Sequence, residues 1–183
     1  MRITLFNGDP DPGSPFQAYV REVAAHLEAS GHAVTTFALR ELNLKGCRGC
    51  WGCWVRTPGE CVQNDDSARL LRAAIGSGLL LLASPVAMGF TSALLKRAMD
   101  QMIPLVHPHL VVQDGEVHHR ARYARYPALG LLLAPGPDTD AEDLEITADM
   151  WSRLARNLKF PTFITAVADR PAAEVALALT AAA

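Results

Sequence analysis

The sequence lacks the features that would place the protein in a membrane, on nucleic acid or outside the cell. Its richest apolar runs, around 79–83 and 129–134, fall far short of the ~20 residues that span a bilayer. Its first residues have neither the apolar core of a signal peptide nor a small-residue cleavage site. A formal net charge of -2 gives no long-range attraction to nucleic acid or to an anionic membrane. We therefore expect a cytoplasmic protein with no nucleic-acid or membrane partner.

Motifs for hydrolysis and phosphoryl transfer are also absent. The chain has no Ser-His-Asp order, no paired-carboxylate motif and no phosphate-cradling Gly-x4-Gly-Lys loop. Hydrolase and kinase functions therefore have no support, and no residue is predicted to be catalytic. Half of the 183 residues are hydrophobic and 20% are charged, which favours a folded chain over a disordered one. A chain of this length is expected to form a single domain over residues 1–183.

Short apolar runs alternate with stretches of helical spacing. The runs are bounded by Gly, Pro or Asp and cover 3–6, 33–39, 79–83, 128–133 and 162–167. Repeated strand–helix–strand units imply a parallel sheet with helices on both faces. The run 79–83 is apolar throughout, as expected of a strand buried on both sides. The pattern predicts an α/β fold, a doubly wound three-layer sandwich of flavodoxin type with a five-stranded parallel sheet.

A ligand site is expected where this sheet reverses its strand order. In doubly wound sheets, ligands bind beyond the carboxyl ends of the strands at that switch point. The rule directs attention to three loops, at 7–16, 84–90 and 135–140.

The segment 104–127 interrupts the alternation before the fourth strand. Its Asp114-Gly115 pair is a strong signal for a tight hairpin turn. We predict a hairpin insert that serves as an oligomer contact or as a lid. His118 and His119 would point to opposite faces of a strand and could not easily chelate one ion. The basic stretch 118–125 fits either the phosphates of a nicotinamide cofactor or a solvated or subunit-contact face.

All four cysteines lie in one loop, 46–62, at Cys47, Cys50, Cys53 and Cys61. The two-residue spacing of the first three lets one tight loop direct three thiolates at a single centre. Iron–sulfur clusters are held by four Cys thiolates, so the pattern favours such a cluster. A structural zinc site, a disulfide and four reduced thiols remain alternatives.

Two segments resemble a known family. The cysteine loop, with Gly59-Glu-Cys61 and Asp65-Asp66 after it, is similar to the iron–sulfur flavoproteins of the NADPH-dependent FMN reductase group. Residues 84–100 are similar to the second FMN loop of that group and the helix after it. The resemblance implies a flavodoxin-like fold, a [4Fe–4S] cluster on the four cysteines, FMN, and a redox partner or NAD(P)H as electron donor. It also implies a homodimer or homotetramer.

The three loops supply the residues expected to bind FMN. In the family, the loop after the third strand wraps the isoalloxazine ring, and the first loop holds the phosphate. The expected cofactor-binding residues are Asp9, Ser14, Phe16, Pro85, Val86, Ala87, Met88, Gly89, Phe90, Pro135 and Gly136.

The first loop departs from the family pattern. The family usually has Gly-Ser-Pro-Arg, whereas here Asp9 replaces the serine and Asp11 replaces the arginine. Each close carboxylate–phosphate pair costs roughly 4 kcal/mol at an effective dielectric near 20. The helix N-terminus after Ser14 still offers its dipole and free amides. FMN in an adjusted pose, a flavin without the phosphate and an empty pocket all remain open, and either aspartate could simply cap the helix.

The sequence therefore predicts a flavin-dependent oxidoreductase or electron-transfer flavoprotein. FMN would lie at the carboxyl ends of the strands, near a four-cysteine iron–sulfur site. The first alternative is a non-catalytic metal-binding or redox-sensing protein of the same fold that has lost FMN. The second is a zinc-stabilised scaffold whose hairpin recruits a partner.

Overall fold

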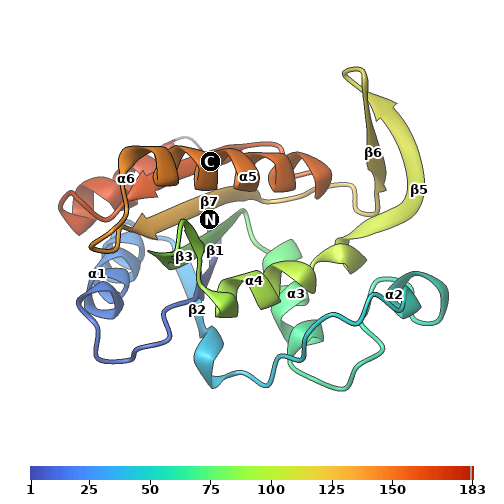
Figure 1. Cartoon of the computed structure of the whole chain (residues 1–183), viewed down its shortest axis with the longest axis horizontal. Coiled ribbons are helices and arrows are strands. Elements are labelled where there is room, and N and C mark those ends of the chain that lie inside the picture. The colour runs from blue at the N-terminus through green and yellow to red at the C-terminus, as the bar shows by residue number, and fades with distance from the viewer. Residues whose placement is uncertain (182) are drawn as a thin grey trace.

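A five-stranded parallel sheet forms the centre of the molecule (Figure 1). The structure is a computed structural model that describes residues 1–181 and 183. The sheet order is β2-β1-β3-β7-β8, the doubly wound arrangement predicted from the sequence. The strands are β1 (Arg2–Asn7), β2 (Ala33–Ala38), β3 (Leu79–Ala87), β7 (Ala128–Ala134) and β8 (Phe163–Val167).

Helices cover both faces of the sheet, so the core has two halves. Alternation along β3 sends Leu79 and Leu81 to one face, against α1 (Pro15–Ala29) and α6 (Ala172–Ala181). Leu80 and Leu82 face the other side, which is covered by α3 (Ser67–Ile75), α4 (Ala93–Asp100) and α5 (Ala141–Asn157). All four leucines are fully buried. No helix among the described residues is both long and apolar enough to cross a membrane.

The second expected loop, 84–90, is mostly strand. β3 continues through Ala87, turns at Met88 and Gly89, and returns as the two-residue β4 (Phe90–Thr91). Met88 and Gly89 have φ of 52° and 70°, which lets this turn be tight. β4 is antiparallel to β3 and adds a short strand that the apolar pattern did not predict.

The predicted hairpin insert is confirmed. β5 (Val106–Gln113) pairs antiparallel with β6 (Glu116–Ala121), and the turn lies at Asp114 and Gly115, both at positive φ. Figure 1 shows the hairpin projecting away from the sheet. Its base follows the short helix η2 (Ile103–Leu105), and two more short helices, η1 (Leu39–Glu41) and α2 (Gly52–Val55), lie in the segment between β2 and α3.

Serine side chains cap two of the helices. Ser14 is the N-cap of α1, and its hydroxyl accepts from the backbone N–H of Gln17 at 2.8 Å. The alternative that Asp9 or Asp11 caps this helix is therefore wrong. Serine also caps α4, where Ser92 accepts from the N–H of Leu95.

Candidate functional site

A cavity of about 430 Å³ lies at the carboxyl ends of the central strands. It is bounded by the loop after β1, the start of α1 and the loop after β7. Six predicted cofactor-binding residues line it together: Asp9, Ser14, Phe16, Pro85, Pro135 and Gly136. Tyr19, Ala134 and Ala168 also line it, with Pro15. A position at the switch point of a doubly wound sheet is where such folds bind their ligands.

Tyr19 was not predicted from the sequence, although it follows Phe16 at helical spacing. Its hydroxyl donates to the carbonyl of Arg170 at 2.8 Å, which ties α1 to the segment after β8. Burial, with a smaller contribution from Asp169, raises the pKa of Tyr19 above its usual value. The phenol therefore stays protonated and presents a neutral aromatic wall to the cavity.

The loop after β1 satisfies its own hydrogen-bond donors. The backbone N–H of Asp11 donates to Asp9 Oδ1 at 3.0 Å, and that of Gly13 donates to Asp11 Oδ1 at 2.8 Å. The hydroxyl of Ser14 donates to Asp9 Oδ2. Asp9 itself is only 3% exposed, so its carboxylate is held inside the loop rather than in solvent. The two aspartates thus accept the hydrogen bonds that an anion bound in this loop would receive.

A buried polar network that could not be predicted from the sequence supports the loop where β1 ends. Asn7 Nδ2 donates to Gln17 Oε1 at 2.7 Å, and Asn7 Oδ1 accepts from the N–H of Asp9 at 3.0 Å. Arg40 donates to Gln17 Oε1 at 2.8 Å and to the carbonyl of Asp9 at 3.3 Å. The guanidinium of Arg40 therefore already has two uncharged acceptors, and it also pairs with Glu41.

The phosphate end of FMN does not fit this loop. Of the ten residues that line the cavity in the described chain, none is Lys, Arg or His. Between Asp9 and Ala18 the backbone N–H of Phe16 alone lacks an acceptor, because Pro10, Pro12 and Pro15 have no N–H. A phosphate dianion here would meet the buried carboxylate of Asp9 with no basic side chain in the described cavity lining.

The remaining predicted cofactor-binding residues lie outside this cavity's lining. Val86 is 4% exposed and packs in the core, whereas Met88 is fully exposed at the tip of the β3–β4 turn. Gly89 lies against α5, where its carbonyl accepts from the hydroxyl of Thr147. Ala87 and Phe90 pair with each other across the turn. The turn thus lies beside the cavity's Pro85 rather than around the cavity itself.

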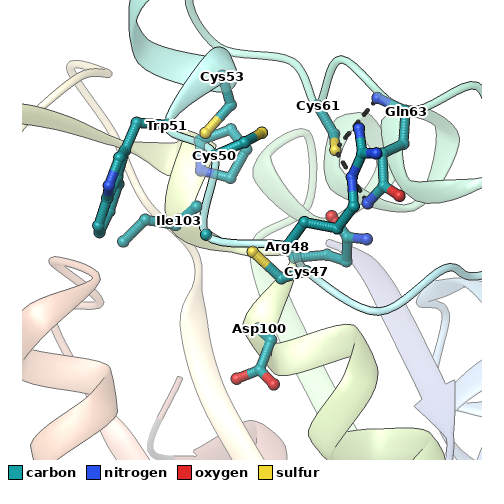
Figure 2. A pocket seen from close by; sticks show the side chains of 12 residues that line it. Cys47, Arg48, Cys50, Trp51, Cys53, Cys61, Gln63, Asp100 and Ile103 are labelled. Carbon is teal, nitrogen blue, oxygen red and sulfur yellow. Dashed lines mark hydrogen bonds between the residues drawn. The ribbon is translucent and has the colours of Figure 1, made fainter.

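A second cavity, of about 340 Å³, is lined by all four cysteines (Figure 2). The carboxyl end of α4 forms part of its wall through Asp100 and Gln101. Gln101 donates to the carbonyl of Lys45 at 2.6 Å, which fixes the start of the cysteine loop. Figure 2 shows the cysteine side chains distributed around the cavity, with Gln63 hydrogen-bonded to Cys61.

The cysteines differ in burial. Cys53 is 8% exposed, Cys61 is half-buried, and Cys47 and Cys50 are exposed. Burial, followed by the charges of the other three thiols, raises the pKa of Cys53. In the described residues no group of three or more His, Cys, Asp or Glu side chains is placed to hold a metal ion. The four thiols thus line one cavity, but the described residues form no preassembled metal-binding group at the predicted iron–sulfur site.

An aromatic stack joins the cysteine loop to the hairpin. Trp51 and Trp54 stack with ring centroids 5.0 Å apart. The ring centroids of Trp54 and His119 of β6 also lie 5.0 Å apart. Trp54 Nε1 donates to the carbonyl of Val106 at 2.9 Å. His118, in contrast, is 3% exposed and bonds to Asn157 and Glu116. The two histidines thus have different partners, as their strand alternation predicts.

Comparisons with known proteins agree with the fold. An FMN-dependent NADH-azoreductase from Bacillus anthracis, solved with FMN, is 11% identical, with a TM-score of 0.65; the match covers 96% of this chain and 94% of that one. An NAD(P)H:quinone oxidoreductase from Methanothermobacter marburgensis is 15% identical, with a TM-score of 0.64 and coverage of 97% and 93%. No curated protein matches the sequence. At these identities the likeness establishes the flavodoxin-like fold alone.

The sequence itself matches a family over residues 1–124, and the description of that family is NADPH-dependent FMN reductase. The matched segment contains the first loop, the cysteine loop and the β3–β4 turn. The chain therefore belongs to the NADPH-dependent FMN reductase family of flavin-dependent, NAD(P)H-dependent oxidoreductases.

Proposed function

We propose that the chain binds the isoalloxazine ring of a flavin in the 430 Å³ cavity and uses it to oxidise a nicotinamide donor. The observation that carries the proposal is the cavity's place and lining, at the switch point and walled by Phe16, Tyr19 and Pro85. A bound flavin supplies the hydride and electron chemistry. The chain's residues position the ring, exclude water from one face and contribute no acid or base.

The lining residues divide this task. Phe16 and Tyr19 come from α1 and offer aromatic surface, while Pro135 and Gly136 follow β7 and bring backbone close to the cavity. A side chain at position 136 would be crowded, because a Cβ there would lie 3.0 Å from the carbonyl oxygen of Val86. We propose that this close approach sets the width of the slot for a planar ring, and that Val86 to Phe90 support its edge.

The test is the visible spectrum of the protein purified without oxygen, followed by an assay for NADH and NADPH oxidation. We expect structured flavin bands, on their own or after addition of flavin, and oxidation that depends on the flavin. Phe16→Ala should weaken flavin binding, whereas Phe163→Ala, at a position outside the cavity, should not. A protein that binds no flavin would contradict the proposal and favour the non-catalytic alternative.

We further propose that Cys47, Cys50, Cys53 and Cys61 hold an iron–sulfur cluster that exchanges single electrons with a redox partner. The proposal is supported by the lining of one cavity by all four thiols and by their close sequence spacing. Trp51, which also lines the cavity, would restrict solvent access and so influence the potential of a bound cluster.

Iron, sulfide and zinc analysis of anaerobically purified protein tests the cluster. We expect iron and sulfide in equal amounts, with both lost in Cys50→Ser. Ser77→Ala, remote from the cavity, is the matched control and should retain both. Zinc without sulfide would indicate the scaffold alternative, and full iron and sulfide in Cys50→Ser would refute the ligand assignment.

A further inference from the structure

We propose that the flavin cavity selects a flavin without a phosphate group, of which riboflavin is the simplest, over FMN. The inference rests on the proposed function, because it specifies which flavin the same cavity takes. It follows from three features of the first loop: an internal anion, the absence of a cation, and the kind of hydrogen bond that remains available.

The internal anion is the carboxylate of Asp9. It is 97% buried by the loop, and its two oxygens accept from the N–H of Asp11 and the hydroxyl of Ser14. Asp11 makes a similar contact, because its carboxylate accepts a hydrogen bond from the N–H of Gly13. The donors at the start of α1 thus already face negative charge supplied by the chain, and a second anion would compete for the same few N–H groups.

Among the described residues, no side-chain cation contacts this carboxylate. The part of the chain that the structure describes places no Lys, Arg or His in the cavity lining, and Arg40 donates to Gln17 and to the carbonyl of Asp9. Arg21 contacts the outer side of the loop, at the carbonyl of Pro12. Since neither guanidinium contacts the Asp9 carboxylate, bringing a phosphate dianion beside that carboxylate is repulsive.

The uncharged ribityl chain of a flavin can form hydrogen bonds with the same loop groups. A hydroxyl can donate to a carboxylate oxygen, whereas a phosphate dianion carries no proton to donate. Asp9 is one of the residues that line the cavity, and its carboxylate has lone pairs beyond the two it already uses. The free N–H of Phe16 supplies one donor for a ribityl oxygen. The terminal hydroxyl of riboflavin therefore fits the position from which the FMN phosphate is repelled.

The experiment measures the affinity of the full chain for riboflavin and for FMN by equilibrium dialysis, and identifies by chromatography any flavin that copurifies. We expect riboflavin to bind at least tenfold more tightly than FMN. Because the repulsion is electrostatic, the ratio should fall as ionic strength rises.

Asp9→Asn tests the cause. Its amide keeps one acceptor and adds a donor, so the preference for riboflavin should fall by about tenfold or more, mainly through tighter FMN binding. Asp149→Asn, which removes an exposed carboxylate of α5 elsewhere on the surface, should leave the ratio unchanged. If Asp9→Asn does not fold, Asp9→Ser replaces it.

The outcomes separate the two proposals. FMN binding as tightly as riboflavin, or more tightly, would overturn this inference and leave the proposed flavin-dependent function standing. Binding of neither flavin would overturn both. A riboflavin preference that persists unchanged in the Asp9 variant that folds would also overturn it, because the discrimination would then not come from the carboxylate of Asp9.

Discussion

Gly8 and Asp9 lie next to each other at the end of β1, and each is constrained by a different kind of contact. Asp9 is fixed by hydrogen bonds to its carboxylate, whereas Gly8 is fixed by lack of space. A Cβ on Gly8 would lie 2.9 Å from the Cβ of Leu95 and 3.2 Å from the carbonyl of Ala83. Neither neighbour is the end of a flexible side chain, so neither can move easily.

Gly8→Ala should therefore destabilise the protein. Overpacking in a closely packed region typically costs about 1–3 kcal/mol, and we expect a loss of free energy of unfolding in that range. Urea unfolding monitored by circular dichroism measures it. Gly46→Ala is the control, since a Cβ there meets nothing within 4 Å. Equal stability of the two variants would show that β1 and α4 can separate without cost.

The four thiols should also differ in reactivity. Burial, with the neighbouring thiols adding to it, raises the pKa of Cys53, so less of its reactive thiolate is present at pH 8. In metal-free protein, Cys53 should be alkylated by iodoacetamide several times more slowly than the exposed Cys50. Peptide mass spectrometry after timed quenching gives the rates. Faster alkylation of Cys53 than of Cys50 would contradict the burial described for this side chain.

At the scale of elements, Glu116 fastens the hairpin to α5. Its carboxylate accepts from Arg153 at 2.8 Å and from Arg156 at 3.3 Å, and it contacts His118 at 2.9 Å. The hydrogen bond from Arg153 is the largest cause that lowers the pKa of Glu116 to about 2. A group whose pKa is lower in the folded state stabilises that state above its unfolded pKa and loses this effect as the pH falls towards its folded pKa.

The contribution of Glu116 should therefore be complete above about pH 4.5 and fade between pH 4.5 and 2. Glu116→Gln should lower the melting temperature at pH 6, and the difference from the wild type should shrink as the pH approaches 2. Thermal unfolding at several pH values measures this. Glu145→Gln, an exposed change on α5, should show no such pattern. A difference that is constant from pH 6 to pH 2 would argue against the ion-pair origin.

Elements were easier to predict from the sequence than the contacts between them. The run 79–83 is apolar because its strand is buried on two faces, and Asp114-Gly115 favours a tight turn through its local backbone preference. The strand and the hairpin turn were therefore both predicted correctly. The N-cap of α1 was left open, because several polar residues precede the helix and only the folded loop shows that Ser14 caps it while the Asp9 carboxylate turns inward. β4 is too short for any periodic signal.

The same limit applies to the candidate sites. Loop positions at the carboxyl ends of strands follow from topology, which is why Asp9, Pro85 and Gly136 were anticipated near one cavity. Tyr19 and Ala168 belong to α1 and to the segment after β8, and only the packing of these elements brings them there. The arrangement of the cysteine sulfurs likewise depends on the path of the loop, which residue spacing alone does not determine.

At the scale of the whole molecule, the two cavities have no lining residue in common and are associated with opposite ends of α4. Ser92, at its start, donates to the carbonyl of Gly8 at 2.6 Å beside the first loop. Asp100, at its end, lines the cysteine cavity and pairs with Lys96. A helix of eight residues is about 12 Å long, so this rigid element sets a spacing between the two regions.

Ligand binding should stabilise the molecule as a whole. A ligand present at 100 times its Kd stabilises the folded state by about 2.7 kcal/mol. For a chain of this size that corresponds to a rise in melting temperature of roughly 5–10 °C. We expect riboflavin to produce this shift at concentrations at which FMN produces little. Differential scanning fluorimetry with both flavins measures it, and equal shifts at equal concentrations would contradict the expected selectivity.

The internal hydrogen bonds of the first loop affect how a flavin binds and dissociates. A loop whose amides and carboxylates satisfy one another keeps its shape without a ligand, so little conformational entropy is lost when the cavity fills. The first loop should therefore be as well ordered in the flavin-free protein as in the flavin complex. The reduced flavin could then dissociate and be replaced by an oxidised one. It would behave as a second substrate rather than as a tightly bound prosthetic group.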